Sequence, residues 1–151
     1  MREILFRGKR LDNGEWIEGC LLKVTLGGNT AHLIFGDKFA FTHAEVKALS
    51  HAIVDPETVG QYTGLKDKNG RRIFEGDIVT DEDVWPMRGV VTFGEGTYDS
   101  GIYRYNGWYV RDERFGRDRC ALVDYDDEWN KFVVIGNIHD NPELVNGGGE
   151  A

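Results

Sequence analysis

The stretch that most constrains the fold runs from Val59 to Val79 and reads as a strand, a turn and a second strand. Asn69-Gly70 supplies two neighbouring residues that tolerate positive φ angles, with apolar residues on both sides of them. Gly64 and Gly76 lie at either end of the hairpin, where a residue without Cβ allows a bend or a bulge. We therefore predict a β-hairpin with a backbone bend at each end.

The same stretch resembles the central signature of the YopX family, small proteins encoded mainly by bacteriophages and prophages. The resemblance is carried by Gln-Tyr-Thr-Gly-Leu-Lys-Asp-Lys-Asn-Gly at 61–70 and Ile-Phe-Glu-Gly-Asp-Ile-Val at 73–79. The opening Met-Arg-Glu-Ile-Leu-Phe-Arg and the closing Val-Ile-Gly-Asn-Ile-His-Asp-Asn-Pro-Glu-Leu resemble the two ends of that family, so residues 1–145 are covered. One departure is local, because Gly8 is followed here by Lys9 where family openings often have Trp. The resemblance implies kinship and transfers no catalytic residue.

The composition favours one β-rich domain. Among 151 residues there are 20 glycines and 3 prolines, and 40% of the chain is hydrophobic, which suits many tight turns around a real core. We predict an all-β protein of about nine to eleven short antiparallel strands and hairpins, with at most one or two helical turns. A single domain is expected over residues 1–145, with a seam at 80–86 and a disordered tail at 146–151.

The architecture expected for this domain is an N-terminal sheet packed with a C-terminal, SH3-like barrel-like half. The second half is suggested by Gly76-Asp77-Ile78-Val79, an acidic connector and the strand at residues 88–94, an order that many small SH3-like barrels share. Residues 36–54 fit neither a strand nor a helix period cleanly. Thr42 and Glu45 could form a capping box, so both alternatives stay open there. The residues expected in the core are Phe6, Trp16, Ile73, Ile78, Val91, Val133 and Ile135.

The net charge argues against a general nucleic-acid binder. Lys and Arg number 18 and Asp and Glu number 26, a formal net charge of −8 that repels phosphates. No basic start leads into an apolar run, and no apolar run approaches the roughly 18 to 20 residues of a membrane span. We therefore expect a protein of the host-cell cytoplasm with no membrane partner.

Metal and cofactor motifs are missing from the sequence. Cys20 and Cys120 form no Cys-x-x-Cys pair, and the histidines at 32, 43 and 51 match no zinc spacing. The acidic run at 124–128 lacks the order of a calcium-binding loop. No nucleophile and base stand at a recognisable spacing. We expect no catalytic, metal or cofactor-binding residues.

The segment Ile102 to Val110 combines Tyr, Trp and Arg, the three residue types that supply much of the binding energy at protein interfaces. It reads as two aromatic strands around an Asn106-Gly107 turn, next to basic residues. The candidate partner-binding residues are Tyr103, Arg104, Tyr105, Trp108 and Arg111. The alternative is that these aromatic side chains only pack across strands of a sheet.

The function predicted from these features is a non-enzymatic binding module for an unknown phage or host macromolecule. A homo-oligomer is compatible with the sequence. The alternatives are a nucleic-acid-binding protein, or an enzyme whose groups converge from distant strands without a recognisable motif.

Overall fold

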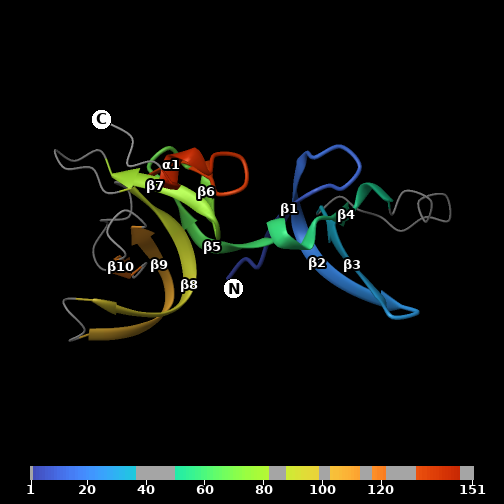
Figure 1. The fold of residues 1–151 in the computed structure, drawn as a ribbon, viewed down its shortest axis with the longest axis horizontal. Helices are drawn as coiled ribbons and strands as arrows, with labels where there is room; N and C mark the ends of the chain where they lie inside the picture. Colours follow the sequence, from blue (N-terminus) through green and yellow to red (C-terminus); the bar gives the residue numbers. More distant parts are fainter. Residues whose placement is uncertain are drawn as a thin grey trace. The chain divides into compact units, whose positions relative to one another are not determined.

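A computed structural model of the chain describes residues 2–36, 50–81, 88–98, 103–112, 117–121 and 132–146, and strands dominate them (Figure 1). The strands are β1 (Phe6–Lys9), β2 (Trp16–Leu26), β3 (Asn29–Phe35), β4 (Ile53–Val54), β5 (Gly60–Lys66), β6 (Arg72–Phe74), β7 (Asp77–Asp81), β8 (Arg88–Tyr98), β9 (Tyr103–Asp112), β10 (Arg117–Ala121) and β11 (Phe132–Asn137). Helical segments are short, as in α1 (Glu143–Asn146) and the 3-10 turn η2 (Pro56–Thr58). The predicted all-β class is confirmed. Within the described ranges, no helix has the length and apolar character needed to cross a membrane.

The chain divides into two compact units, Met1–Tyr62 and Thr63–Ala151. Strand β5 begins in the first unit and ends in the second. Most of the seam expected at 80–86 and most of the tail expected at 146–151 lie outside the described residues. The single domain over residues 1–145 stays a prediction.

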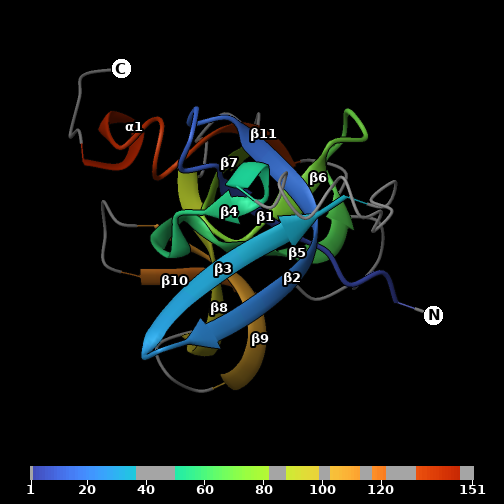
Figure 2. The ribbon, with the colours of Figure 1, turned by 90° about the vertical axis from the view of Figure 1, so that its right-hand side faces the viewer.

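In the first unit the strands follow the hydrogen-bonded order β4-β3-β2-β1-β5, and all pairs with a defined register are antiparallel. Strand β2 pairs with β1 over Trp16–Gly19 and with β3 over Cys20–Leu26. Figure 2 shows β2 and β3 running side by side as a long ribbon. Their connection, Gly27-Gly28, has φ angles of 56° and 85°, which are those of the type I′ turn that matches strand twist.

The core of the first unit differs from the expected one. Ile34 and Val54 are 2% and 1% exposed, and both lie against Gly8, where an added Cβ would approach them to 3.1 Å. Phe6 and Trp16, expected to be buried, are only half-buried. Cationic side chains cover the Trp16 ring, with Arg7 Cζ 4.8 Å and Lys9 Nζ 5.5 Å from its centroid. The indole therefore packs under charged side chains that remain attracted to its face.

The central hairpin of the sequence forms β5, β6 and β7. Gly64, Gly70 and Gly76 have φ angles of 90°, 81° and 83°, so the predicted bends are confirmed. Asp67, only 3% exposed, holds the turn between β5 and β6. Its Oδ1 accepts hydrogen bonds from the backbone N–H groups of Asn69 and Arg71, each at 2.9 Å. Its Oδ2 accepts from the N–H of Val134 at 3.1 Å, which ties the turn to β11.

The second unit is built on an antiparallel sheet with the order β10-β9-β8-β7-β11. Of the expected core residues, Ile73, Ile78 and Val91 are 0%, 0% and 1% exposed, so these three are confirmed. The buried hydrophobic cluster consists of Ile73, Val79, Val91, Trp108, Val110, Phe132 and Val134, with Leu65 packed against it.

The expected core register of β11 is wrong by one residue. Phe132 and Val134 are 2% and 6% exposed, whereas Val133 is half-buried and Ile135 is 36% exposed. Alternate strand residues point to opposite faces, and the apolar run gave no sign of which parity faces inward. A register shift between Val134 and Gly136 marks an irregularity where the strand leaves the regular pairing with β7.

The expected turn at Asn106-Gly107 is also wrong. Strand β9 runs through both residues, paired with β8 from Val90↔Arg111 to Tyr98↔Tyr103. Gly107 lies opposite Gly94, and their φ angles of 156° and 152° favour glycine. Two facing glycines thus let the hairpin curve without ending a strand, as the bent β8 and β9 in Figure 1 show.

A closed, SH3-like barrel is not confirmed. Among the described residues β10 pairs with β9 and β11 pairs with β7, which leaves β10 and β11 at the outer ends of an open sheet.

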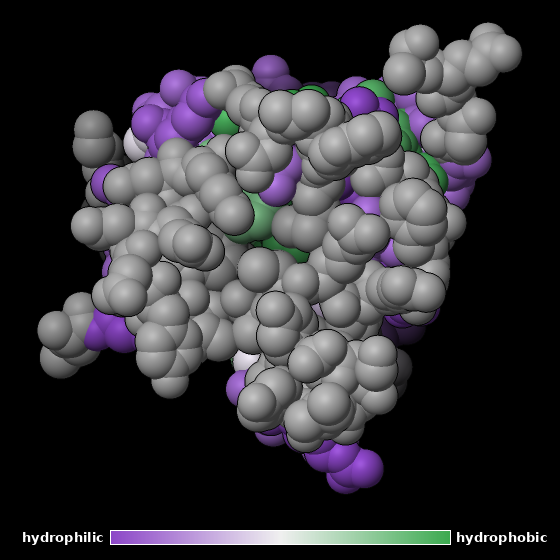
Figure 3. All heavy atoms as spheres, turned by 90° about the vertical axis from the view of Figure 1, so that its left-hand side faces the viewer, coloured by the Kyte–Doolittle hydropathy of each residue, from purple (hydrophilic) through white to green (hydrophobic). Residues whose placement is uncertain are grey.

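The capping box of Thr42 and Glu45 and the acidic run at 124–128 lie outside the described residues. Figure 3 shows one face of the molecule, where small hydrophobic areas are visible near the centre and towards the upper right, and most hydrophilic side chains lie along the margin.

Candidate functional site

The hairpin of β8 and β9, here called the β8–β9 ribbon, carries an exposed aromatic side chain mounted on a buried one. Phe93 is 56% exposed and stands opposite Trp108, which is 9% exposed and belongs to the hydrophobic cluster. The two ring centroids are 4.9 Å apart with an interplanar angle of 66°, an edge-to-face pair. Phe93 is therefore held by the core while most of its ring faces solvent.

Strand alternation extends this aromatic pair into a surface. The register of β8 and β9 is continuous, so residues two apart share a side. Glu95 and Asn106 form the next pair on the side of Phe93 and Trp108, and Arg104 follows on that same side. All three are exposed. We call these five residues the Phe93 face.

The structure separates the two arginines of the predicted site. Arg104 and Arg111 are both exposed, but they are seven positions apart in one strand and so lie on opposite sides of it. Trp108 lies on the same side as Arg104 and is buried next to Phe93. Tyr103 and Tyr105 lie in β9, and their side chains are outside the described part of the chain. Phe93 was missed by sequence reasoning because its cross-strand pairing with Trp108 depends on the register.

Trp108 also presents a buried donor without an acceptor. Its Nε1 is inaccessible to solvent and has no hydrogen-bond partner among the described residues. An indole N–H that is buried without a partner costs free energy that a hydrogen bond would recover. The atom lies in the ring against which Phe93 packs.

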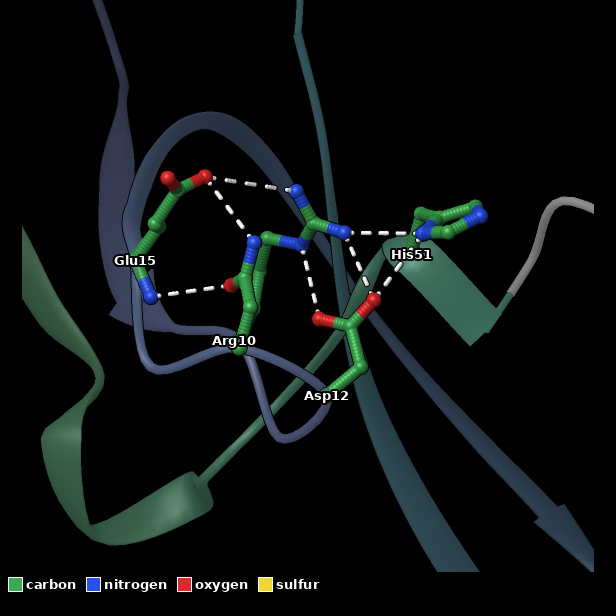
Figure 4. A network of polar contacts seen from close by, with 5 residues as sticks. Arg10, Asp12, Glu15 and His51 are labelled. Carbon is green, nitrogen blue, oxygen red and sulfur yellow. Dashed lines mark hydrogen bonds and ion pairs between the residues drawn. The ribbon is translucent and has the colours of Figure 1, made fainter.

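A second cluster of polar side chains gathers at the loop between β1 and β2 (Figure 4). The Arg10 guanidinium binds the Asp12 carboxylate through Nε–Oδ1 at 2.9 Å and Nη2–Oδ2 at 2.6 Å. Glu15 Oε2 lies 3.7 Å from Arg10 Nη1. His51, 39 positions from Asp12, places its Nδ1 2.9 Å from Asp12 Oδ2 and 2.8 Å from Arg10 Nη2.

The charges of this cluster favour the ionised form of Asp12. The hydrogen bond from Arg10 lowers the pKa of the Asp12 carboxyl below its ordinary value of 3.8; burial opposes this, and His51 adds to the lowering. The other ring nitrogen of His51 points away from Asp12 (Figure 4). Within the described residues no hydroxyl or thiol is hydrogen-bonded to His51. Through His51, the cluster joins the β1–β2 loop to the residues just before β4.

The described residues contain no group of three or more His, Cys, Asp or Glu side chains placed to hold a metal ion. Cys20 is a free, exposed thiol. Asp67, Asp77, Asp81 and Asp112 are buried, and the hydrogen bonds of Asp67 and of Asp77, whose Oδ2 accepts from the N–H of Phe74 at 2.8 Å, serve turns. Asp67 and Asp77 therefore stabilise backbone structure in the second unit.

Charge is distributed unevenly along the sequence. Residues 1–62 contain seven Lys and Arg against eight Asp and Glu, a net charge of −1. Residues 63–151 contain eleven against eighteen, a net charge of −7. The Phe93 face therefore belongs to the acidic unit.

Comparison with known proteins identifies a family and a similar solved structure. The pattern of the family described as "YopX protein" matches residues 5–146 of the chain. No curated protein matches it. The crystal structure of protein EF1440 from Enterococcus faecalis is similar, with 21% sequence identity over 96% of this chain and 99% of that one, and a TM-score of 0.39.

Proposed function

The chain belongs to the YopX family, and we propose that it acts as a binding module that recognises a protein partner through the Phe93 face. The observation that carries the proposal is the exposed ring of Phe93 fixed on the buried Trp108. Interfaces are enriched in aromatic side chains and arginine, and rigid aromatic anchors lose little conformational entropy on binding. A partner would cover Phe93 and contact Arg104 beside it.

The polar residues of this face suit a specific contact. Glu95 and Arg104 are exposed and offer one charge of each sign within the same side of the ribbon. Such charges fix orientation more than they add affinity. Tyr103, Tyr105 and Arg111 lie at the alternate positions of β9, and a contact through them stays a prediction from the sequence, which the Arg111→Ala variant tests.

The acidic charge of the second unit favours a protein over a nucleic acid as the partner. Its net charge of −7 repels phosphates, so a nucleic acid would have to overcome repulsion around the Phe93 face. The phage or prophage origin and the location in the host cytoplasm are further parts of this proposal. They are supported by the resemblance of the sequence to its family.

The test is affinity capture from a nuclease-treated lysate of the infected host, read by quantitative mass spectrometry. Phe93→Ser and Arg104→Ala change the proposed face, and Arg111→Ala is the matched control on the opposite side of β9. We expect capture of one partner to fall about tenfold or more with Phe93→Ser, to weaken with Arg104→Ala and to persist with Arg111→Ala. Circular dichroism confirms that each variant is folded.

Equal capture by a folded Phe93→Ser, Arg104→Ala double variant would contradict the use of this face. Loss of capture after nuclease treatment of the wild-type complex would instead favour a nucleic-acid partner and contradict the protein one. Arg104→Ala and Arg111→Ala alter exposed side chains, for which changes in unfolding free energy stay within about 0.5 kcal/mol. Phe93→Ser also loses the edge-to-face contact with Trp108, which is worth about 0.5–1.5 kcal/mol.

A further inference from the structure

Strand β2 has an unpaired edge over more than half of its length. Residues Cys20–Leu26 pair with β3 on one side, while on the other side β1 reaches only Trp16–Gly19. In the described part of the chain no strand pairs with that second side of Cys20–Leu26. An open edge of this kind offers backbone donors and acceptors to an added strand.

The turn decides which backbone groups face this edge. Gly27-Gly28 forms a type I′ turn, so Leu26 and Asn29 close the hairpin as a hydrogen-bonded pair. Hydrogen-bonded and non-hydrogen-bonded pairs alternate along an antiparallel ladder. The N–H and C=O groups of Leu21, Lys23 and Thr25 therefore point to the open edge.

The two faces of the same strand differ sharply in polarity. One face of the β2–β3 ribbon is mostly apolar. It consists of the cross-strand pairs Cys20–Phe35, Leu22–Leu33, Val24–Ala31 and Leu26–Asn29. Leu22 and Leu26 are 46% and 75% exposed. The other face of this segment carries the exposed polar residues Lys23 and Thr25, with the half-buried Leu21 at its far end.

We propose that a second copy of this chain adds its β2 strand to this edge, antiparallel, around a two-fold axis at Val24. Val24 then faces Val24 of the other copy, and Leu22 faces Leu26, so apolar side chains meet apolar ones. Lys23 of one copy and Thr25 of the other exchange backbone hydrogen bonds across the axis. The result is a sheet with the order β3-β2-β2-β3 and an isologous interface.

The sequence around Val24 is what favours a second copy as the occupant. The alternative register, centred on Lys23, would set two ammonium groups directly opposite each other, which is destabilising. Centring on Val24 avoids that contact and sets Leu22, Val24 and Leu26 opposite apolar residues of the other copy. The first unit has a net charge of only −1, so two copies meet there with little electrostatic repulsion. This interface is independent of the Phe93 face.

The test uses two opposite charges at one exposed position. In the proposed register Thr25 faces Lys23 of the other copy, twice per dimer, so Thr25→Glu should tighten the dimer by roughly 2- to 30-fold and Thr25→Lys should weaken it by a similar factor. Thr30→Glu and Thr30→Lys are the controls. Both sets remove the hydrogen bond between the Thr25 and Thr30 hydroxyls, 2.9 Å apart, but Thr30 lies in β3, away from the edge.

Sedimentation equilibrium of the full chain measures the dissociation constant of each variant, with circular dichroism as the check on folding. Opposite shifts at Thr25 and unchanged constants at Thr30 support the proposal. A wild-type chain that stays monomeric up to about 1 mM overturns it. So do Thr25 variants that shift the constant in one direction, or not at all, because the contact then lies elsewhere or in another register.

A cross-link locates the axis independently. In a background of Cys20→Ser and Cys120→Ser, Val24→Cys places two thiols across the axis in a non-hydrogen-bonded pair, where Cα atoms are about 4.5 Å apart and a disulfide can form. Thr25→Cys in the same background is the control, because its two thiols lie diagonally apart. Rapid dimer cross-linking with oxidised glutathione at position 24 and slow cross-linking at position 25 support the axis. The reverse order overturns it.

Discussion

The two long hairpins, β2–β3 and β8–β9, show that an apolar strand face does not by itself become core. At the base of β8–β9 the face with Val91, Val110 and Trp108 is covered by the hydrophobic cluster of the second unit. The apolar face of β2–β3 leaves Leu22 and Leu26 exposed, although its alternation of apolar and polar residues is at least as regular. Within the described ranges, what differs is whether the chain supplies a second layer.

Carboxylates show the same difference between the units. Asp67 in the second unit is buried, and all its hydrogen bonds go to backbone N–H groups of a turn and of β11. Asp12 in the first unit is partly exposed and pairs with the side chains of Arg10 and His51. Buried carboxylates should therefore control the stability of the second unit, whereas the exposed one should only adjust the position of a loop.

The largest expected effect separates the two hairpins. Trp108→Ala should lower the unfolding free energy of the second unit by about 3–5 kcal/mol, because it empties part of the cluster. Leu26→Ala in β2 should change the stability of the first unit by no more than about 0.5 kcal/mol in dilute solution. Hydrogen exchange measures the two units separately. Similar losses for the two variants would mean that the β2–β3 face is covered as well.

The sequence predicted the positions of strands and turns better than it predicted which face of each strand is buried. Asn69-Gly70, together with Gly64 and Gly76, predicted a turn and two bends, since a positive φ is a local property of one or two residues. The Asn106-Gly107 turn failed because a facing glycine, Gly94, lets the same dipeptide continue a strand. That pairing is set by a register across β8 and β9, which local residue types do not reveal.

The candidate site was predictable only in part for the same reason. The cluster of aromatic residues and arginines in β9 is visible in the sequence, but the split of Arg104 and Arg111 between two sides needs a continuous strand. Phe93 reaches Trp108 because β8 pairs with β9. His51, just before β4, reaches Asp12 in the loop between β1 and β2. Long-range contacts of this kind leave no spacing signal in a single sequence.

A second prediction sharpens the contrast between the carboxylates. Asp67→Ala should destabilise the second unit by roughly 2–5 kcal/mol, because three backbone N–H groups lose a buried, charged acceptor. Chemical denaturation followed by near-ultraviolet circular dichroism measures the loss. Asp12→Ala is the matched control in the first unit and should leave that transition in place. An Asp67 variant as stable as the wild type would show that the turn is held by other contacts.

A third prediction applies the rule of covered and uncovered faces within one strand. Val134→Ala should cost roughly 1.5–3 kcal/mol, the value of burying a valine side chain, because Val134 faces the cluster. Ile135→Ala, on the opposite side of β11 and 36% exposed, should cost less than Val134→Ala even though it removes more atoms. Denaturation midpoints compare the two variants. A larger loss for Ile135→Ala would restore the register first expected from the sequence.

The smallest effect concerns the pH dependence of the Asp12 cluster. The folded-state pKa of Asp12 is lowered, chiefly by its hydrogen bond from Arg10, so its stabilising contribution is fully present above the unfolded value near 3.8. It is lost as the pH falls through the lower, folded pKa, when the carboxyl takes up a proton.

Carboxyl carbon NMR of Asp12 should give a titration midpoint below 3.8, and Arg10→Gln should raise that midpoint towards the ordinary value. Replacing His51 with Gln should raise it less, because the hydrogen bond from His51 is the weaker cause. A midpoint unaffected by Arg10→Gln would mean that Arg10 does not hold the loop in solution.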